Sequence, residues 1–182
     1  MEKDKLNLGC GKNILEGYKN CDCINGKGID RVANLNKYPW PFKENSFKEI
    51  IFDSVLEHID NPEKAIREVW RISKKNGITR ITVPHFSCWQ AWGDITHKRP
   101  FNSTSLFSFS DKNTHRKSSS LLNSQKEIFD ISTKITFGKI KRGLLFERIF
   151  NINNFSRGFY ERNIAYILPA ENIVFNIRAI KK

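Results

Sequence analysis

The sequence contains no apolar run that approaches the roughly 20 residues needed to cross a bilayer, and its charged start, MEKDK, lacks the apolar core of a signal peptide. Cysteine is also scarce. The four cysteines form no C-x-x-C pair and do not have the paired spacing of a structural zinc site. We therefore expect a cytoplasmic protein that has no membrane span, keeps its thiols reduced and holds no metal.

The remaining composition is typical of a globular protein. The 182 residues are 39% hydrophobic and 12% aromatic, which is enough to bury a substantial core. No internal repeat and no second domain are visible, so the sequence predicts one domain over residues 1–182. Residues 111–126, which are polar and rich in serine, are expected to form a mobile loop within it.

Positive charge is concentrated in the second part of the chain. Residues 1–60 carry 9 Lys and Arg against 10 Asp and Glu, whereas residues 61–182 carry 22 against 9. Such asymmetry is typical of a protein that meets an anionic partner: RNA, a phosphorylated or nucleotide-linked small molecule, or a membrane surface. A basic surface that only faces solvent explains the charge equally well, so charge alone leaves the partner open.

Short apolar runs alternate with helix and turn signals. The clearest helix is predicted over Asn61–Lys75, where Asp60 or Asn61 can cap the first turn, Pro62 suits it, and Gly77 follows the end. Further elements are a helix over Ser156–Leu168 and strands over Lys5–Leu8, Tyr18–Cys23, Asp30–Leu35, Glu49–Asp53, Ile78–Pro84, Ile128–Thr136 and Ile173–Ile180. This order predicts an α/β fold with a largely parallel sheet.

The stretch LNLGCGKNILEGYKNCD runs from an apolar strand directly into Gly-x-Gly. Glycines at the carboxyl end of a strand let a ligand approach the backbone, although such turns are also common without a ligand. Asp22, near the end of the next strand, can accept hydrogen bonds from both hydroxyls of a ribose. Only Lys12–Gly17 separate Gly11 from the next strand, and this connection is too short for the usual helix. The loop therefore suits a nucleotide-like ligand that has no pyrophosphate for a helix to hold.

Several motifs follow in a fixed order: LNLGCG, Asp22, VANLNKYPWPFKENSFKEIIF, VLEH, RITVPHF, DITHKRPF and the tail YERNIAYILPAENIVFNIRAIK. In these the chain resembles the class I S-adenosylmethionine-dependent methyltransferases, specifically the type 11 methyltransferase-domain group. The resemblance covers nearly the whole chain. It implies a Rossmann-like three-layer sandwich with a seven-stranded, mostly parallel sheet and an antiparallel last strand, and S-adenosylmethionine as the cofactor.

The resemblance also implies residue roles. Gly9, Cys10 and Gly11 would line the methionine end of the cofactor, Asp22 its ribose, Asn34 and Leu35 its adenine, and Asp53 and Ser54 its sulfonium. Two positions depart from the family pattern. Asn13 stands where many relatives have a third glycine, and Asn34 replaces a common aspartate but keeps an acceptor for the adenine amino group.

Methyl transfer to oxygen or nitrogen requires a group that removes the acceptor's proton. The candidates are His97, Asp94 and His85, in and just before the aromatic segment that follows VPHF. Asp94 can orient an imidazole or act itself. A structural role is an equal alternative for His97 and the favoured one for His85. His58, in Leu-Glu-His, is expected to fix the start of a helix.

The same segment supplies the candidate substrate residues. Trp89 and Trp92, with Phe86 and Phe101, can shield the acceptor from water, although core packing explains at least half of these aromatic residues equally well. Lys98 and Arg99 can bind an anionic acceptor or simply face solvent.

The sequence therefore predicts a methyltransferase that acts on an oxygen or nitrogen of a small or glycan-like acceptor. This acceptor either carries a phosphate or nucleotide group or has none. Two alternatives stay open: an RNA methyltransferase, favoured by the basic charge, and a non-catalytic binding module, favoured by the shortened loop. The sequence does not indicate an oligomeric state.

Overall fold

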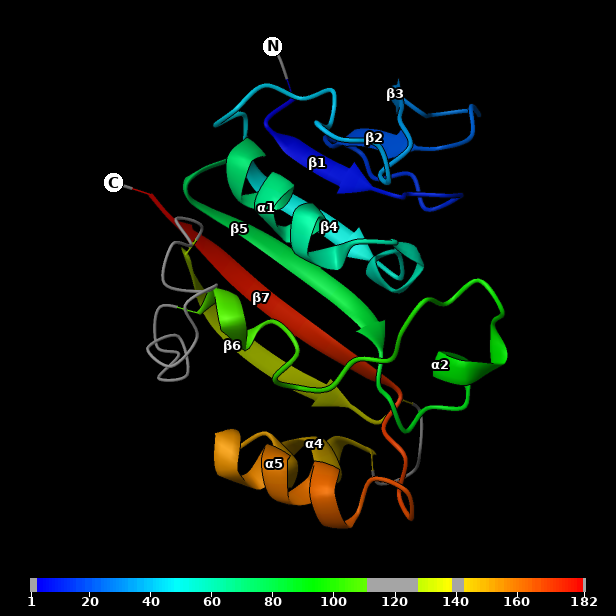
Figure 1. Cartoon of the computed structure of the whole chain (residues 1–182), viewed down its shortest axis with the longest axis vertical. Helices are drawn as coiled ribbons and strands as arrows, with labels where there is room; N and C mark the ends of the chain where they lie inside the picture. The colour runs from blue at the N-terminus through cyan, green and yellow to red at the C-terminus, as the bar shows by residue number, and fades with distance from the viewer. Residues whose placement is uncertain (1–2, 111–127, 139–142, 182) are drawn as a thin grey trace.

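The computed structural model describes residues 3–110, 128–138 and 143–181, and its centre is one seven-stranded sheet (Figure 1). The strand order is β3-β2-β1-β4-β5-β7-β6, with β7 antiparallel to both neighbours and the pairs from β3 to β5 parallel. This confirms the predicted mixed sheet with an antiparallel last strand. The strands are β1 (Lys5–Leu8), β2 (Lys19–Asp22), β3 (Arg31–Val32), β4 (Phe47–Asp53), β5 (Ser73–Pro84), β6 (Ile128–Thr136) and β7 (Asn172–Ile180). The expected serine-rich loop, residues 111–126, lies outside the described residues.

The predicted helix after Leu-Glu-His is present as α1 (Pro62–Ile72). Asn61 caps it, because its side chain accepts a hydrogen bond from the backbone N–H of Lys64 at 2.9 Å. The predicted end at Lys75 was wrong by three residues. The backbone of Ser73 is extended and pairs with Phe47, so β5 begins directly after the helix.

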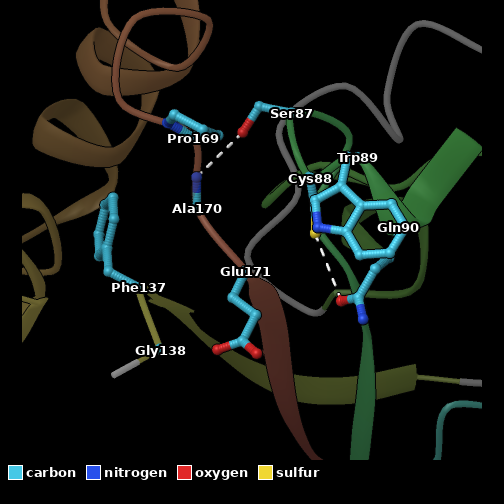
Figure 2. A pocket seen from close by; sticks show the side chains of 9 residues that line it. All are labelled: Ser87, Cys88, Trp89, Gln90, Phe137, Gly138, Pro169, Ala170 and Glu171. Carbon is cyan, nitrogen blue, oxygen red and sulfur yellow. Dashed lines mark hydrogen bonds between the residues drawn. The ribbon is translucent and has the colours of Figure 1, made fainter. Parts of the chain in front are cut away.

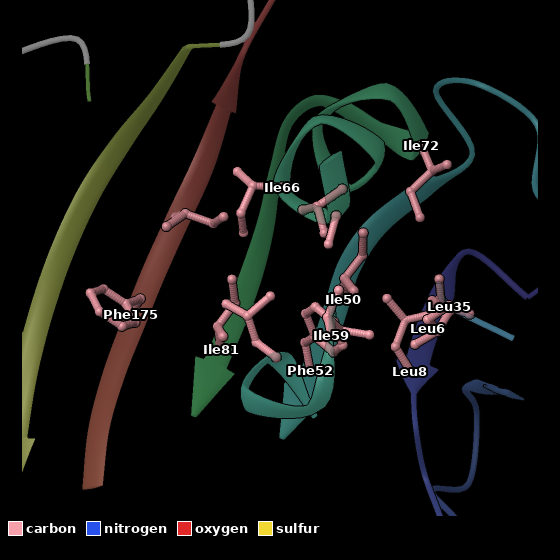
Figure 3. Close-up of a cluster of buried hydrophobic side chains, with 14 of the residues drawn as sticks. Leu6, Leu8, Leu35, Ile50, Phe52, Ile59, Ile66, Ile72, Ile81 and Phe175 are labelled. Carbon is pink, nitrogen blue, oxygen red and sulfur yellow. The ribbon is translucent and has the colours of Figure 1, made fainter. Parts of the chain in front are cut away.

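The main core lies between α1 and one face of the sheet. Ile66 and Ile72 of α1 pack over Ile50, Ile81 and other strand residues, as Figure 3 shows. Because side chains alternate along a strand, Asn7 of β1 and Arg80 of β5 point to the opposite face. There Arg80 is exposed, and the second helical layer expected of a three-layer sandwich is not among the described residues.

A second, smaller core lies beside β6 and involves two helices, α4 (Gly143–Phe150) and α5 (Asn154–Asn163) (Figure 1). Phe137 meets Phe146 and Phe150 of α4 and Tyr160 of α5 at ring-centroid distances between 5.2 and 5.9 Å. The sequence analysis missed α4. It also extended α5 to Leu168, whereas residues 164–168 form turns.

The described residues also contain three short helices: η1 (Leu56–His58), α2 (Gln90–Gly93) and η2 (Phe107–Phe109). Two predicted strands were too long. β2 stops at Asp22, so Cys23 leaves the sheet and is exposed, and β3 has two residues instead of six. None of the helices in the described ranges combines the length and apolar character that crossing a membrane requires.

Candidate active site

The residues assigned to a cofactor gather along one edge of the sheet. Neighbouring strands β3, β2, β1 and β4 run parallel, so their carboxyl ends meet at the same edge. The predicted residues follow these ends directly: Gly9, Cys10 and Gly11 after β1, Asp22 at the end of β2, Asn34 and Leu35 after β3, and Asp53 and Ser54 at the end of β4. This edge is where open α/β sheets bind their ligands.

The glycine loop after β1 needs glycine for two separate reasons. Gly9 has φ +62°, and a Cβ there would lie 2.4 Å from Cγ2 of Val55. Gly11 has φ +49°, but a Cβ there would meet no atom within 4 Å. Gly9 is therefore required by packing against the segment after β4, whereas Gly11 leaves open space beside the backbone.

Two buried asparagines hold this loop without a helix. Asn20 of β2 accepts from the N–H of Leu15 and donates to the carbonyl of Leu15, both at 3.0 Å. Asn7 of β1 donates to the carbonyl of Asn13 at 2.8 Å. Side-chain amides thus satisfy backbone groups that a helix would otherwise satisfy internally.

Asp22 connects the ends of β1 and β2. Its Oδ2 accepts a 2.7 Å hydrogen bond from the N–H of Gly11, and its Oδ1 accepts from the N–H of Ile24 at 3.1 Å. Partial burial acts to raise the pKa of this carboxyl, but the hydrogen bonds from Gly11 and Ile24 outweigh it and leave the pKa below its ordinary value. Asp22 is therefore an ionised acceptor beside the glycine loop.

The other edge residues differ in exposure. Asn34 is exposed and accepts from the N–H of Asn36, while Leu35 is buried and its carbonyl accepts from the indole of Trp40. Asp53 and Ser54 are exposed, and Ser54 has φ +54°, a conformation that is uncommon outside glycine. The chain therefore bends sharply just after β4.

A cavity of about 600 Å³ adjoins this edge beyond β4. Its lining comes from the ends of β4, β5 and β7 and from the segment after β5: Ser54, Glu57, His58, Pro84, Trp89, Gln90, Gly93, Asp94, Ile95, His97 and Asn172. Ser54 belongs both to the edge and to this cavity. The structure thus places two predicted catalytic residues, His97 and Asp94, in the lining of the same cavity as Ser54.

Four side chains lie together beside this cavity: Asp94, Thr96, His58 and His97, with Nε2 of His97 3.9 Å from a carboxylate oxygen of Asp94. Thr96 donates to Asp94 at 2.6 Å, and Nδ1 of His58 lies 2.9 Å from the same hydroxyl oxygen. The rings of His58 and His97 are 4.7 Å apart, and Nδ1 of His97 lies 3.3 Å from the carbonyl of Ala91. The bonds from Thr96 hold the pKa of Asp94 below its ordinary value.

Glu57 is the residue that the sequence analysis missed. It is 2% exposed although it lines the cavity, and its Oε2 has no hydrogen-bond partner among the described residues. Burial raises the pKa of this carboxyl to about 7, despite the opposing effect of nearby His97. The segment 94–99 buries it, since the N–H of Lys98 bonds the carbonyl of Glu57 at 2.7 Å.

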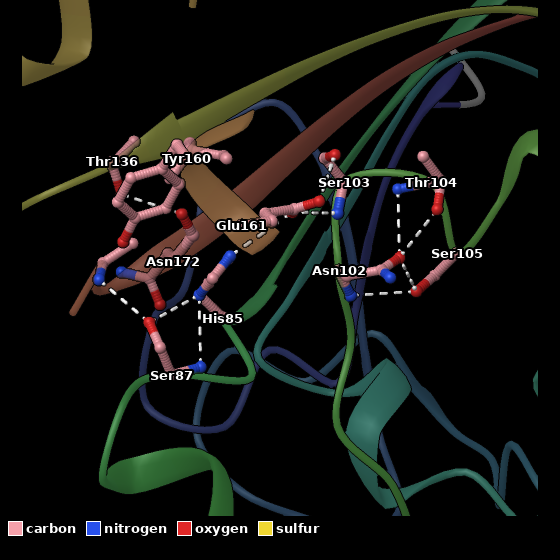
Figure 4. Close-up of polar contacts among 12 residues, drawn as sticks. His85, Ser87, Asn102, Ser103, Thr104, Ser105, Thr136, Tyr160, Glu161 and Asn172 are labelled. Atoms are coloured by element: carbon pink, nitrogen blue, oxygen red, sulfur yellow. Dashed lines mark hydrogen bonds and ion pairs between the residues drawn. The ribbon is translucent and has the colours of Figure 1, made fainter. Parts of the chain in front are cut away.

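His85, the third predicted catalytic residue, lies in a different environment. It is fully buried, with Nδ1 2.7 Å from the hydroxyl of Ser87 and Nε2 3.3 Å from Glu161 of α5 (Figure 4). Glu161 also accepts from the backbone and the hydroxyl of Ser103. Both ring nitrogens of His85 are therefore engaged, and the contact with Glu161 joins the end of β5 to α5.

The predicted substrate residues fall into two groups. Trp89 lines the cavity and is 77% exposed, while Trp92 is 65% exposed and donates to the carbonyl of Phe86. Lys98 lies 3.6 Å from Asp60, and Arg99 donates to the Asp60 carbonyl, so both basic groups face α1 and neither lines the cavity.

A second cavity, of about 510 Å³, opens on the other side of Trp89 (Figure 2). Trp89 and Gln90 line both cavities. Across from them the backbone of Ala170 donates to Ser87, and Glu171 extends its carboxylate into the space. The segment after β5, which contains Trp89 and Gln90, therefore separates these two cavities.

Part of the chain matches a known protein family. Residues 19–81 match the family model described as a methyltransferase domain of type 11, a stretch that runs from β2 into β5. No curated protein sequence matches the chain.

Solved structures share the fold over nearly the whole chain. A methyltransferase from Archaeoglobus fulgidus is 16% identical, with 96% of this chain and 85% of that one covered and a TM-score of 0.59. One from Thermotoga maritima is also 16% identical, with coverage of 100% and 83% and a TM-score of 0.56. Phosphoethanolamine N-methyltransferase 2 of Haemonchus contortus, in complex with S-adenosyl-L-methionine, is 15% identical, with coverage of 98% and 48% and a TM-score of 0.53.

Proposed function

We propose that this chain is a class I S-adenosylmethionine-dependent methyltransferase, as its motifs predicted and as its fold and matched domain support, and that it methylates an oxygen or nitrogen of a small acceptor. The acceptor would bind in the 600 Å³ cavity, which begins at Ser54, beside the edge that holds the cofactor. This adjacency is the observation that carries the proposal, since methyl transfer requires donor and acceptor to be aligned.

The residues at the sheet edge fit the cofactor. Open space beside Gly11 admits a ligand close to the backbone, and the ionised Asp22 offers oxygens to ribose hydroxyls. Gly9, Cys10 and Gly11 would hold the methionine end, Asn34 and Leu35 the adenine, and Asp53 and Ser54 the region of the sulfur. S-adenosylmethionine supplies an electrophilic methyl group when bound, so the protein itself must position the acceptor and accept its proton.

We propose that a side chain on the cavity wall that contains His97 and Asp94 accepts the proton of the methyl acceptor. Both side chains line the cavity, and His97 adjoins His58 and the buried Glu57. We assign His85 a structural role instead, because it is fully buried and both ring nitrogens are engaged. Trp89 would cover the acceptor, and Trp92 would support that segment through its bond to the carbonyl of Phe86.

The size and lining of the cavity favour a small or glycan-like acceptor over a folded macromolecule. Ligand pockets for small molecules have volumes of roughly 300–1,000 Å³ and a few placed polar groups. The basic charge of residues 61–182 supports RNA as the second candidate acceptor. The proposed location is the cytoplasm, where the four cysteines, which are free, would remain reduced.

Release of S-adenosylhomocysteine tests this function. Wild-type protein and a His97→Ala variant would each receive S-adenosylmethionine with sets of small alcohols, amines, phosphorylated sugars and short RNAs. We expect release above background with a member of the small-molecule sets and its loss in the variant. Turnover only with RNA, with binding that falls steeply as salt rises, would instead support the second candidate.

A further inference from the structure

Three side chains on the cavity wall are arranged as the ligands of a metal ion. One ligand atom from each of Glu57, His58 and His97 lies within 4.8 Å of the others. We propose that these residues bind a divalent transition-metal ion, with zinc as the reference case, and that the ion holds and activates the methyl acceptor. The site itself is independent of the proposed function, but the role of the ion in activation rests on it.

The hydrogen bonds of both histidines leave one ring nitrogen ready to bind a metal. The hydroxyl proton of Thr96 is donated to Asp94, so Nδ1 of His58 must be the donor in its contact with Thr96. Nδ1 of His97 faces a carbonyl oxygen, which only accepts, so it also carries a proton. In a neutral imidazole, Nε2 then keeps its lone pair. Metal-binding histidines usually show this pattern of an outer N–H donated to a carbonyl or a carboxylate.

Glu57 gives independent support for a cation. Its Oε2 is buried and has no hydrogen-bond partner among the described residues, yet the side chain lines the cavity with both histidines. A buried carboxylate without a partner is costly, and a positive ion in the cavity would remove that cost.

The ligand set indicates what kind of ion fits. Two imidazoles and one carboxylate are the protein ligands of many catalytic zinc sites, which leave one position open for water or substrate. Zinc–ligand bonds of about 2.0–2.2 Å require the three ligand atoms to approach to roughly 3–3.5 Å, so binding would draw segment 94–99 toward η1. The cysteines take no part in this set, and the proposed site departs from the prediction from sequence that the protein holds no metal.

The open coordination position of the metal ion explains how an acceptor hydroxyl would be activated. A hydroxyl bound to a divalent metal loses its proton far more easily than a free one, and because His97 is then a ligand, Asp94 on the same wall would accept that proton. The oxygen of the acceptor then forms a bond to the methyl carbon as the carbon–sulfur bond breaks, and the electron pair of that bond stays on sulfur. The products are the methyl ether, S-adenosylhomocysteine and one proton, so atoms and charge balance.

Cobalt binding tests the site directly. The chain would be dialysed against a chelator and titrated with Co²⁺, followed by calorimetry and visible absorption, and then with Zn²⁺ in competition. We expect one ion per chain, visible ligand-field bands without a thiolate charge-transfer band, and at least a 100-fold loss of affinity in His97→Ala. Thr96→Val, which frees His58 from its hydrogen bond, should lose roughly 10- to 100-fold.

A control variant distinguishes cobalt bound at the proposed site from cobalt bound by a thiol. Cys23→Ser removes an exposed thiol and should bind cobalt like the wild type. The proposal fails if cobalt does not bind at millimolar concentration, if His97→Ala binds as tightly as the wild type, or if binding shows a thiolate band that Cys23→Ser abolishes. Titration of the same preparations with S-adenosylhomocysteine separates the two claims: cofactor binding without metal binding would reject the metal site alone.

Discussion

Asn7 of β1 donates a 3.0 Å hydrogen bond to the side-chain oxygen of Asn20 of β2, and both residues are only 2% exposed. The pair links neighbouring parallel strands on the sheet face opposite α1. Each asparagine also bonds the backbone of the loop between them. A polar pair therefore holds the glycine loop in place without a helix between β1 and β2.

Replacing Asn20 should destabilise the protein. Asn20→Ala leaves buried backbone groups of Leu15 and the amide of Asn7 without their partners, so we expect the free energy of unfolding to fall by about 2–3 kcal/mol. Urea denaturation followed by circular dichroism measures this change. Asn25→Ala, at an exposed position in the following loop, should change it by less than about 0.5 kcal/mol. Equal effects of both substitutions would contradict the role given to Asn20.

The two glycines of the loop should respond differently to alanine. Both have positive φ, which costs an alanine about 1–2 kcal/mol. Gly9→Ala adds a clash with Val55, so it should lower the melting temperature well below that of Gly11→Ala. Gly11→Ala should stay folded but bind S-adenosylhomocysteine more weakly, because its methyl group enters the open space. Thermal melts and calorimetry would measure both effects, and a reversed order of stability would contradict this assignment.

Substitutions of His85 and His97 should have different effects, one on thermal stability and the other on turnover. His85→Phe keeps a ring but loses the contacts to Ser87 and Glu161, so we expect lower thermal stability and unchanged affinity for S-adenosylhomocysteine. His97→Ala should leave both quantities nearly unchanged and abolish methyl transfer to the acceptor identified by the release assay. A stable His85→Phe with no turnover would instead make His85 the catalytic histidine.

The features that the sequence predicted depend on local patterns. The cap at Asn61 and the apolar stripe of α1 follow from spacing within a few residues, and the structure has both. The glycine turn and Asp22 lie at consecutive strand ends, so their meeting follows from parallel pairing. The end of α1 was misjudged because Ser73 pairs with Phe47, a contact that nothing within the helix signals.

The features that the sequence did not predict depend on distant contacts. Glu57 looks like one residue of a helix start, and its burial comes from a segment about 40 residues later that bonds its carbonyl. His85 lies in VPHF next to the candidate site residues, but its partner Glu161 is on α5. Burial and partners of this kind follow from the folded arrangement, so residue patterns favoured a structural role for His85 without indicating its partner, and they gave Glu57 no distinct role.

Calorimetric titration with S-adenosylhomocysteine tests the central claim, that the chain binds this cofactor at the ends of β1 and β2. We expect one site per chain in the wild type and in Glu16→Gln, an exposed change in the same loop. Asp22→Asn keeps the shape of the side chain but loses its charge, so affinity should fall at least tenfold, about 1.4 kcal/mol. No heat from the wild type at millimolar concentration, or unchanged affinity in Asp22→Asn, would contradict the account.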